Sequence, residues 1–335
     1  MTHLTLIRSK HLHPFASLLN QAGEQVGRIL TKARLPGDCL DDPETPIPAN
    51  ALFHFREHAG RALGTHNIAL DATRNLQLAT LGEFGQALLS APTLYRLLTT
   101  FRDHFQTQST IVKLELVRCE SGDVRLCFRF HDPPEFGVWH SDLYTLQWAL
   151  KVVRLVTPTW SPAQVWSMSS PEGGRREVCE ELNVEQVDFG RDCTGFVIPS
   201  SMLALPLTNN KMRGAKVDDE LLRQTTLPTS TTDSLRHAIR SYAGESWLSI
   251  GEVAEVFDSS ARTIQRQLTA ERTSYTRLIE QTRMEIAGER LESTEIAIAD
   301  IARQVGYTHQ ANFTRAFRRW AGVSPRQYRH QRSSR

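Results

Sequence analysis

Near its C-terminus, at residues 301–331, the chain reads IARQVGYTHQANFTRAFRRWAGVSPRQYRHQ. This segment holds six arginines, with a seventh at Arg332, and contains no Asp or Glu. A basic tail solvated by water would need no order among its apolar residues. Here Phe313, Ala316, Phe317 and Trp320 recur at i, i+3, i+4 and i+7, which is the spacing of one helical face. We therefore predict a folded helix whose four apolar residues belong in a core.

The outward face of this predicted helix has a composition that suits a polyanion. Its side chains and those on its flanks include Arg, Asn and Thr but no acid; they are Ala311, Asn312, Thr314, Arg315, Arg318 and Arg319. Such side chains contact base edges and phosphates in DNA complexes. A face that is only solvated more often mixes both signs of charge, so we favour DNA over the alternative of a plain helical bundle with a basic surface.

A second copy of the pattern lies about 48 residues upstream, where Leu248–Leu268 matches Ile296–Phe317. Each copy indicates a short helix, a tight turn and a second helix. Ser249 and Glu252 fit a capping box, and the turns hold Asp258 and Gly306, two residue types that tolerate a left-handed backbone. Ser260 and Thr308 are the predicted caps of the two second helices. In the first copy the outward residues are Arg262, Gln265, Arg266 and Thr269.

These residues carry a family resemblance. The segment from Leu235 to Arg329 resembles the DNA-binding domain of the AraC/XylS family of bacterial transcription regulators. The most specific residues are Gly306 and Tyr307 followed by a spaced series that ends in AGVSPRQYR: Phe313, Arg315, Phe317, Arg318, Gly322, Ser324, Pro325, Tyr328 and Arg329. The resemblance implies an all-α domain in which a long helix, here Tyr275–Leu291, joins two helix-turn-helix units.

The resemblance and the outward faces together predict the DNA contacts. In the first unit they are Arg262, Gln265 and Arg266. In the second they are Gln310, Ala311, Asn312, Thr314 and Arg315. Arg318, Arg319 and Arg329 either contact phosphates or only make the end of the chain more polar. Two departures from the family pattern concern the first unit: Asp258 stands where the family usually has glycine, and ERTSYTRLIEQTRM replaces a glycine-containing turn.

Charge is unevenly distributed along the 335 residues. From Arg236 onward there are 16 Arg, no Lys and 11 acids, which leaves 23 basic and 26 acidic residues before it. A basic C-terminal part and a mildly acidic N-terminal part imply different partners. Arginine suits bidentate contacts with phosphate or guanine, although a high genomic G+C content would also enrich Arg over Lys.

The length predicts about two domains. We expect an α+β effector-sensing and dimerisation domain at 1–207, a polar linker at 208–233 with one short helix, and an all-α DNA-binding domain at 234–335. Helices are expected at 15–32, 49–63, 81–105 and 141–156. The runs IVKLELVRC and VRLCFRF around ESGD predict a hairpin, and short strands are expected at QVWSMS, QVDFG and TGFVIP.

Residues 78–105 and 187–207 resemble the N-terminal domain, often labelled arabinose-binding-like, that one branch of the same family carries. This resemblance implies a small-molecule effector but does not identify it. Trp139, Trp148, Trp160 and Trp166 either line an effector pocket or, as is more common, belong to an aromatic core.

Other side chains suggest sites only weakly. His140 and Asp142 form an H-x-D pair, for which a packed histidine beside a helix-start residue is a simpler explanation than a metal. His11 and His13 need a further ligand to bind metal, and a disordered start explains them better. Cys119 and Cys127 lie on opposite arms of the predicted hairpin, so they form either a thiol switch or two inert thiols.

The sequence therefore predicts a cytoplasmic, sequence-specific transcription regulator, an activator that binds double-stranded DNA, RNA polymerase and a small-molecule effector as a homodimer. The five scattered cysteines fit a reducing compartment. No membrane span, secretory signal, cofactor motif or metal site is expected. An enzyme fused to the DNA-binding module, such as an alkyl-accepting repair protein, would need clustered cysteines or a catalytic motif that we do not find. A DNA-binding architectural protein without an effector is the remaining alternative.

Overall fold

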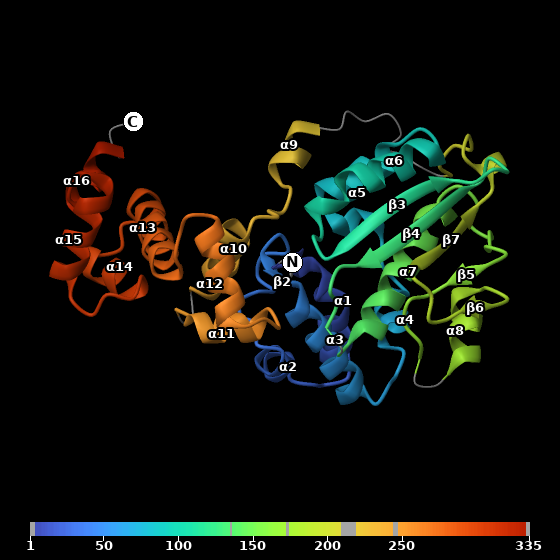
Figure 1. Ribbon diagram of the computed structural model, residues 1–335, viewed down its shortest axis with the longest axis horizontal. Coiled ribbons are helices and arrows are strands. Elements are labelled where there is room, and N and C mark those ends of the chain that lie inside the picture. Colours follow the sequence, from blue (N-terminus) through green and yellow to red (C-terminus); the bar gives the residue numbers. More distant parts are fainter. Residues whose placement is uncertain (1–3, 135, 172–173, 209–218, 244–246, 333–335) are drawn as a thin grey trace. The chain divides into compact units, whose positions relative to one another are not determined.

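The computed structural model describes residues 4–134, 136–171, 174–208, 219–243 and 247–332. The chain divides into two compact units, Met1–Thr229 and Ser230–Arg335 (Figure 1). Residues 209–218 of the expected linker lie outside the described residues. Its remaining part includes the helix α9 (Asp219–Gln224), which belongs to the first unit. No helix among the described residues is both long and apolar enough to cross a membrane.

The N-terminal unit contains a five-stranded sheet with the order β3-β4-β7-β5-β6. Its strands are β3 (Val112–Arg118), β4 (Val124–Phe130), β5 (Val165–Trp166), β6 (Val187–Asp188) and β7 (Thr194–Ile198). The predicted hairpin and the three predicted short strands are confirmed. β5 and β6 are parallel and the other neighbouring strands are antiparallel. A separate two-stranded sheet joins β1 (Leu6–Arg8) to β2 (Pro46–Pro48).

Helices dominate the first hundred residues, as expected, but two predicted helices are each divided in two. Besides short 3-10 turns and α9, the described helices of this unit are α1 (His13–Gln21), α2 (Val26–Lys32), α3 (Ala49–Leu63), α4 (Ile68–Thr73), α5 (Glu83–Ser90), α6 (Leu94–His104), α7 (Val138–Arg154) and α8 (Arg175–Leu182). The 15–32 segment breaks at Gly23, whose φ is +78°. The 81–105 segment breaks at Ala91, which is extended because it precedes Pro92.

Helices cover one face of the sheet. Along β4, Leu126, Phe128 and Phe130 are buried while Arg125 and Arg129 are exposed, the alternation of a sheet with one helix-covered face. Phe128 contacts Phe101 of α6, and Phe130 contacts Phe53 of α3. α6 also packs against β3, and α7 against β7 (Figure 1). The core of the unit therefore lies between this face and the helices.

The C-terminal unit is entirely helical in its described part and repeats one pattern twice. Its helices are α10 (Thr231–Tyr242), α11 (Ile250–Val256), α12 (Ala261–Ala270), α13 (Tyr275–Ser293), α14 (Ile298–Gln304), α15 (Gln310–Ala321) and α16 (Pro325–Arg332). The capping box of Ser249 and Glu252 is confirmed, and Ser260 caps α12 by accepting from the Thr263 amide. Thr308, however, is not a cap, because α15 begins after His309, which makes no side-chain cap bond.

Turn geometry agrees with the two predicted left-handed positions and adds a third. Asp258 and Gly306 have φ of +47° and +83°. Arg272, in the segment that replaces the family's glycine-containing turn, has φ of +57°. A non-glycine residue in this region costs roughly 1–2 kcal/mol relative to an ordinary helical conformation. The fold therefore accepts local strain at Arg272 where a glycine would relieve it.

The core of the second repeat forms around Phe313 and Phe317, which are both fully buried. They pack with Leu291 of α13 and Ile301 of α14. Trp320 was expected in this core, but its side chain is 43% exposed. Its ring still lies against that of Phe317, with the centroids 5.4 Å apart. It therefore lies at the edge of the core.

Candidate nucleic-acid interface and a buried cavity

The two second helices, α12 and α15, present the residues predicted from the sequence. Phe313 and Phe317 of α15, like Ile264 and Leu268 of α12, are fully buried, so the opposite faces point outward. Seven of the eight predicted contact residues are exposed and Thr314 is half-buried; the exposed ones are Arg262, Gln265, Arg266, Gln310, Ala311, Asn312 and Arg315. The structure brings each set together on one helix.

Two of these side chains also form a hydrogen bond with each other. The Nη2 of Arg315 donates to the Oδ1 of Asn312 at 2.7 Å, which fixes the guanidinium along the exposed face of α15. The helix α13 lies within the C-terminal unit and connects its two helix-turn-helix motifs. It has 19 residues, and at 1.5 Å per residue it spans roughly 28 Å. Major-groove segments one turn apart on the same DNA face are separated by about 34 Å. The connecting helix thus has the length scale of the DNA repeat.

Among the described residues of the C-terminal unit, the ion-paired arginines and the arginines of α12 and α15 lie on different helices. Acids on α10 and α13 pair with Arg236 and Arg240: Arg240 contacts Glu289 at 2.5 Å, and Arg236 lies 3.8 Å from Glu285. Within the described residues, by contrast, the arginines of α12 and α15 form no ion pair with an acid; they are Arg262, Arg266, Arg315, Arg318 and Arg319. These two helices also contain no Asp or Glu. Their outer faces therefore leave positive charge available to an external anion.

The three candidate phosphate contacts separate into two kinds. Arg318 and Arg319 are exposed on α15. Arg329 on α16 donates from Nη2 to the carbonyl oxygen of Ile296 at 2.6 Å and is half-buried. Arg329 therefore ties α16 to the segment before α14, a structural contact that the sequence pattern does not distinguish from a phosphate contact.

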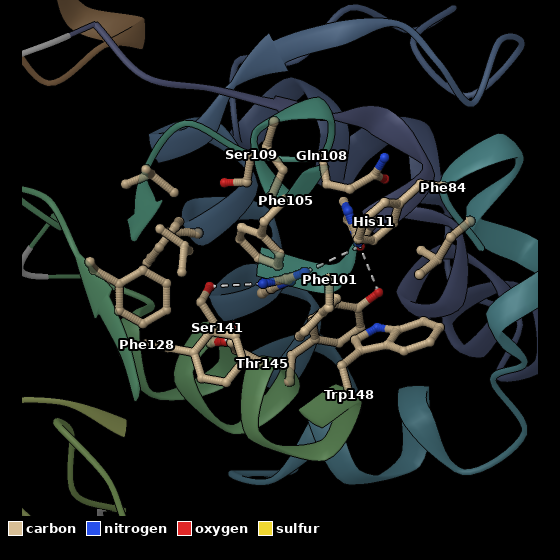
Figure 2. Close-up of a pocket in the computed structure, with 18 residues that line it drawn as sticks. His11, Phe84, Phe101, Phe105, Gln108, Ser109, Phe128, Ser141, Thr145 and Trp148 are labelled. Atoms are coloured by element: carbon tan, nitrogen blue, oxygen red, sulfur yellow. Dashed lines mark hydrogen bonds between the residues drawn. The ribbon is translucent and has the colours of Figure 1, made fainter. Parts of the chain in front are cut away.

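The N-terminal unit contains an aromatic cavity of about 50 Å³ between the sheet and its covering helices (Figure 2). Six phenylalanines from five separate segments line it: Phe53, Phe84, Phe101, Phe105, Phe128 and Phe130. Trp148 of α7 lines the cavity as well, whereas Trp139, Trp160 and Trp166 do not. Of the four tryptophans, Trp148 therefore lies at this cavity, and the effector-pocket alternative stays a prediction.

Sequence analysis missed Arg56, which lines this cavity and is only 2% exposed. The helical spacing of the sequence already indicates that Arg56 is buried. Arg56 follows Phe53 by three residues and precedes Ala59 by three, so it falls on the buried face of α3. A charged residue on an apolar helical face is expensive to bury, and such a position deserves a functional hypothesis.

One short segment both lines the cavity and holds the linker. Phe105, Gln108 and Ser109 line the cavity. Between them, the carbonyl of Gln106 accepts from the Leu227 amide at 3.1 Å, just beyond α9. The segment 105–109 is therefore shared by the cavity wall and by the chain that leads toward the DNA-binding unit.

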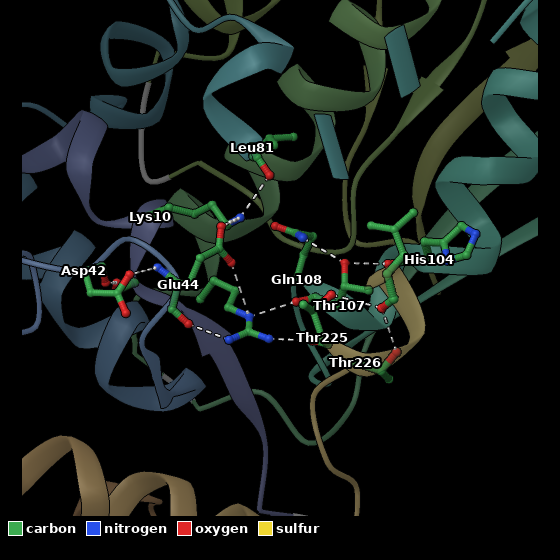
Figure 3. Close-up of polar contacts among 12 residues, drawn as sticks. Lys10, Asp42, Glu44, Leu81, His104, Thr107, Gln108, Thr225 and Thr226 are labelled. Atoms are coloured by element: carbon green, nitrogen blue, oxygen red, sulfur yellow. Dashed lines mark hydrogen bonds and ion pairs between the residues drawn. The ribbon is translucent and has the colours of Figure 1, made fainter. Parts of the chain in front are cut away.

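A buried arginine reinforces this attachment (Figure 3). Arg8 donates from Nε to the Thr107 carbonyl at 3.0 Å and from Nη2 to the Thr225 carbonyl at 2.5 Å. Its Nη1 donates to the Glu44 carbonyl at 2.5 Å, and the carboxylate of Glu44 pairs with Lys10 at 2.6 Å. Burial lowers the pKa of both Arg8 and Lys10, and the carboxylate of Glu44 opposes that shift. The cluster fastens the end of α9 to the N-terminal unit.

The weaker candidates have structural roles. Asp142 is fully buried in α7 and accepts from the hydroxyls of Ser167 at 2.6 Å, Ser169 at 2.7 Å and Thr194, and from the Ser169 amide at 3.1 Å. It thereby joins α7 to the loop after β5 and to β7. His140 is packed in the core, where burial lowers its pKa to about 4. No group of three or more potential metal ligands occurs in the described part of the chain.

The segment from Leu4 to His13 is ordered, contrary to the disordered start that was expected. β1 begins at Leu6, and His11 is buried with its Nδ1 3.2 Å from the hydroxyl oxygen of Tyr144. Burial, with Arg56 nearby, lowers the pKa of His11 well below its ordinary value. His11 therefore packs as a neutral ring.

Of the two alternatives for Cys119 and Cys127, the thiol switch is wrong, because the two thiols do not lie opposite each other. In the register of the hairpin, Cys127 lies opposite Glu115, and Cys119 follows the end of β3. Cys127 instead neighbours Cys193, whose thiol donates to it across 3.1 Å. Burial raises the pKa of the Cys127 thiol to about 12, so it is an inert thiol at neutral pH.

Two acid-free helices on a repeated helix-turn-helix unit, joined to a domain with an aromatic cavity, define a DNA-binding regulator with a separate sensing domain. Comparison with known proteins gives the family: the chain belongs to the AraC family of transcription regulators. Residues 23–207 match the arabinose-binding domain of AraC transcription regulators, and residues 253–331 match a helix-turn-helix domain.

Relatives match over nearly the whole chain. The HTH-type transcriptional regulator VirS of Mycobacterium tuberculosis is 24% identical over 328 residues, which cover 97% of this chain and 96% of that protein. The ornithine utilization regulator of Pseudomonas aeruginosa is 20% identical, with 97% and 96% covered. Among solved structures, the transcriptional regulator CdpR from Pseudomonas aeruginosa covers 96% of this chain and 98% of its own at 19% identity, with a TM-score of 0.47.

Proposed function

We propose that this regulator is a cytoplasmic activator that binds DNA as a homodimer and contacts RNA polymerase when an effector occupies its N-terminal unit. Each C-terminal unit reads one half-site of about two helical turns, with α12 and α15 in successive major-groove segments. The observation that carries the proposal is the absence of any acid on these two helices, together with arginines that form no ion pair with the described residues of the unit.

The proposed contacts differ in what they read. Arg262, Gln265 and Arg266 of α12 face bases in one groove segment. Gln310, Ala311, Asn312, Thr314 and Arg315 of α15 face the next, where Asn312 holds the guanidinium of Arg315 in place for a bidentate contact with guanine. Arg318 and Arg319 contact phosphates. This division makes base preference and salt dependence separable, because phosphate contacts add affinity without selecting a sequence.

Genomic selection tests the proposal. The purified full chain is incubated with fragmented DNA of its own genome, and the bound fragments are recovered and sequenced. We expect a few sites that share a half-site motif of about 20 base pairs. Each half-site then holds two successive major-groove segments. Binding spread evenly over the genome, both with and without cell extract as a source of effector, would show an architectural protein and refute the regulator's sequence specificity.

Coupling between the two units is proposed to run through segment 105–109. A ligand that displaces Phe105 or Gln108 shifts the carbonyls that hold Leu227 and Arg8, and through them the linker. A ligand can move such an equilibrium only if it has different affinities for the attached and released states. Activation then follows from a changed placement of the DNA-binding units in the dimer.

A further inference from the structure

We propose that the cavity of the N-terminal unit binds a small organic monocarboxylate, whose carboxylate group pairs with Arg56 and whose apolar part packs against the phenylalanines. The inference rests on the proposed function, in that it assigns a chemical class to the effector. The argument starts from Arg56, because its charge has no counterpart in the described part of the N-terminal unit.

The guanidinium of Arg56 is poorly satisfied for a buried cation. Nη1 donates to the hydroxyl of Ser141 at 3.0 Å, and Nη2 reaches the carbonyl of His11 only at 3.4 Å (Figure 2). Nε has no hydrogen-bond partner. The guanidinium carbon lies 4.2 Å from the ring centre of Tyr144 and 4.8 Å from that of Phe15, so aromatic faces replace a carboxylate. Across the described residues, no Asp or Glu pairs with Arg56.

This arginine nevertheless remains charged. Burial lowers the pKa of Arg56 to about 10, which is still well above neutral pH. A buried charge without a counterion is strongly destabilising, and proteins normally pair it or exchange it for an apolar residue. An arginine kept beside an internal cavity is therefore explained by an anion that enters that cavity.

Two further polar groups at the cavity lack partners. The hydroxyl of Ser109 is buried and makes no hydrogen bond, and the Oε1 of Gln108 accepts none. Both residues line the cavity and come from segment 105–109 (Figure 2). The Ser109 hydroxyl, like Nε of Arg56, can donate to a carboxylate oxygen. Gln108 leaves one acceptor for a hydroxyl or amide hydrogen of the ligand.

The rest of the lining restricts the ligand. It contains no Asp, Glu or Lys, so an ammonium group would be buried without a partner, which disfavours amino acids and polyamines. The six phenylalanines favour an apolar body over a sugar. A volume of about 50 Å³ corresponds to roughly four waters. A short aliphatic acid suits that space most closely, and a larger acid such as benzoate requires the aromatic rings of the lining to rotate outward, because a cavity that holds benzene measures about 150 Å³.

Calorimetric titration of the full chain without DNA tests this assignment. The probes are butyrate and benzoate, and the controls are butyramide, benzamide and butylamine, which have nearly the same shapes without the negative charge. We expect saturable binding of at least one acid and roughly 10- to 100-fold weaker binding of its amide, the effect of losing a charge-assisted hydrogen bond. Absence of acid binding up to about 10 mM, or equal binding of acid and amide, overturns the proposal.

Variants locate the site. Arg56→Met should weaken acid binding by a similar factor, whereas Arg61→Met, on the exposed face of the same helix, should leave it unchanged. The ligand-free Arg56→Met protein should melt at the same or a higher temperature, because an unpaired buried charge is removed. A lower melting temperature together with unchanged acid binding would make Arg56 a structural residue and refute the site. If the variant does not fold, the comparison of acid with amide on the unaltered chain still decides.

DNA binding is measured separately, by fluorescence anisotropy with a selected fragment. Specific DNA binding without any acid binding would refute this inference and leave the regulator intact. Acid binding without specific DNA binding would refute the proposed regulator and leave the assignment of the cavity intact.

Discussion

Replacing Arg8 with methionine should release the linker from the N-terminal unit. The Arg8 side chain is 11% exposed and reaches across to Thr225, the residue that follows α9 by one position. Methionine keeps most of the apolar stem and removes every donor. The substitution therefore weakens the attachment of the linker more than it changes the packing of the core.

The expected increase in local opening follows from the contacts that Arg8 makes. Only the bond from Nη2 to Thr225 joins Arg8 to the linker, and a hydrogen bond from a charged donor contributes about 1.5–3 kcal/mol. The buried side chains of Leu222 and Leu227 remain, as does the bond from the Leu227 amide to Gln106. Local opening of residues 219–227 should thus become roughly 10- to 150-fold more frequent while the unit stays folded.

Limited proteolysis and hydrogen exchange measure this opening. Trypsin cleaves after Arg223, which lies in α9 and is exposed, and its cleavage rate should rise by about the same factor when opening is fast. Amide exchange over 219–227 should accelerate in parallel. Arg102→Met is the matched control, because Arg102 lies on the surface of α6, where its ion pair is with its neighbour Asp103.

An unchanged rate at Arg223 together with unchanged exchange would refute the reasoning. A large fall in melting temperature would instead show that Arg8 supports the N-terminal unit through its bonds to Glu44 and Thr107.

Four other changes test separate parts of the structure. Arg315→Ala should weaken specific DNA binding by about 1–3 kcal/mol and relax one base position; equally selective binding in anisotropy competition would contradict its assignment. Arg272→Gly should raise the free energy of unfolding by about 1 kcal/mol in urea, because φ is +57° there, whereas Arg277→Gly inside α13 should lower it by a similar amount. Asp142→Asn should lower it by about 3 kcal/mol, since the Ser169 amide loses a charged acceptor; a change below 1 kcal/mol would contradict this. His140 has a folded pKa of about 4 against an ordinary 6.5, so the unfolded chain binds more protons in that window. Stability should fall as pH drops from 6.5 toward 4, by up to about 1.4 kcal/mol per pH unit, and a His140→Asn chain with the same pH slope would exclude this cause.

The C-terminal unit was largely predictable because its information is local. Helical periodicity fixed which residues are buried, and short-range caps marked where α11 and α12 begin. The error at Thr308 has a local cause too. Asp258 and Gly306 are 48 positions apart, but the N-caps Ser260 and His309 are 49 apart. The second turn therefore holds one more residue than the first, which moves the cap past Thr308.

The N-terminal unit was predictable only in its elements. Gly23 and Pro92 mark helix breaks that propensity alone could have located. The cavity could not be predicted, because its lining comes from residues between Ile7 and Trp148 that meet only after folding. The pairing of Cys127 with Cys193 likewise depends on the order of the strands, in which β7 lies beside β4. Non-local contacts of this kind leave no periodic signal in the sequence.

The attachment of the linker also limits how strongly an effector can act. Among the described residues, the bonds from Arg8 to Thr225 and from Leu227 to Gln106 hold the linker beyond α9, and together they contribute about 2–4 kcal/mol. If cavity occupancy acts by breaking or forming them, DNA affinity changes by no more than roughly 30- to 700-fold. Linkage is reciprocal, so DNA must change the affinity of the ligand by the same factor. Arg8→Met removes the bond to Thr225, which supplies most of this free energy of attachment. The variant should bind ligand and DNA separately with little coupling, and a variant that kept the full response would place the relay outside segment 105–109.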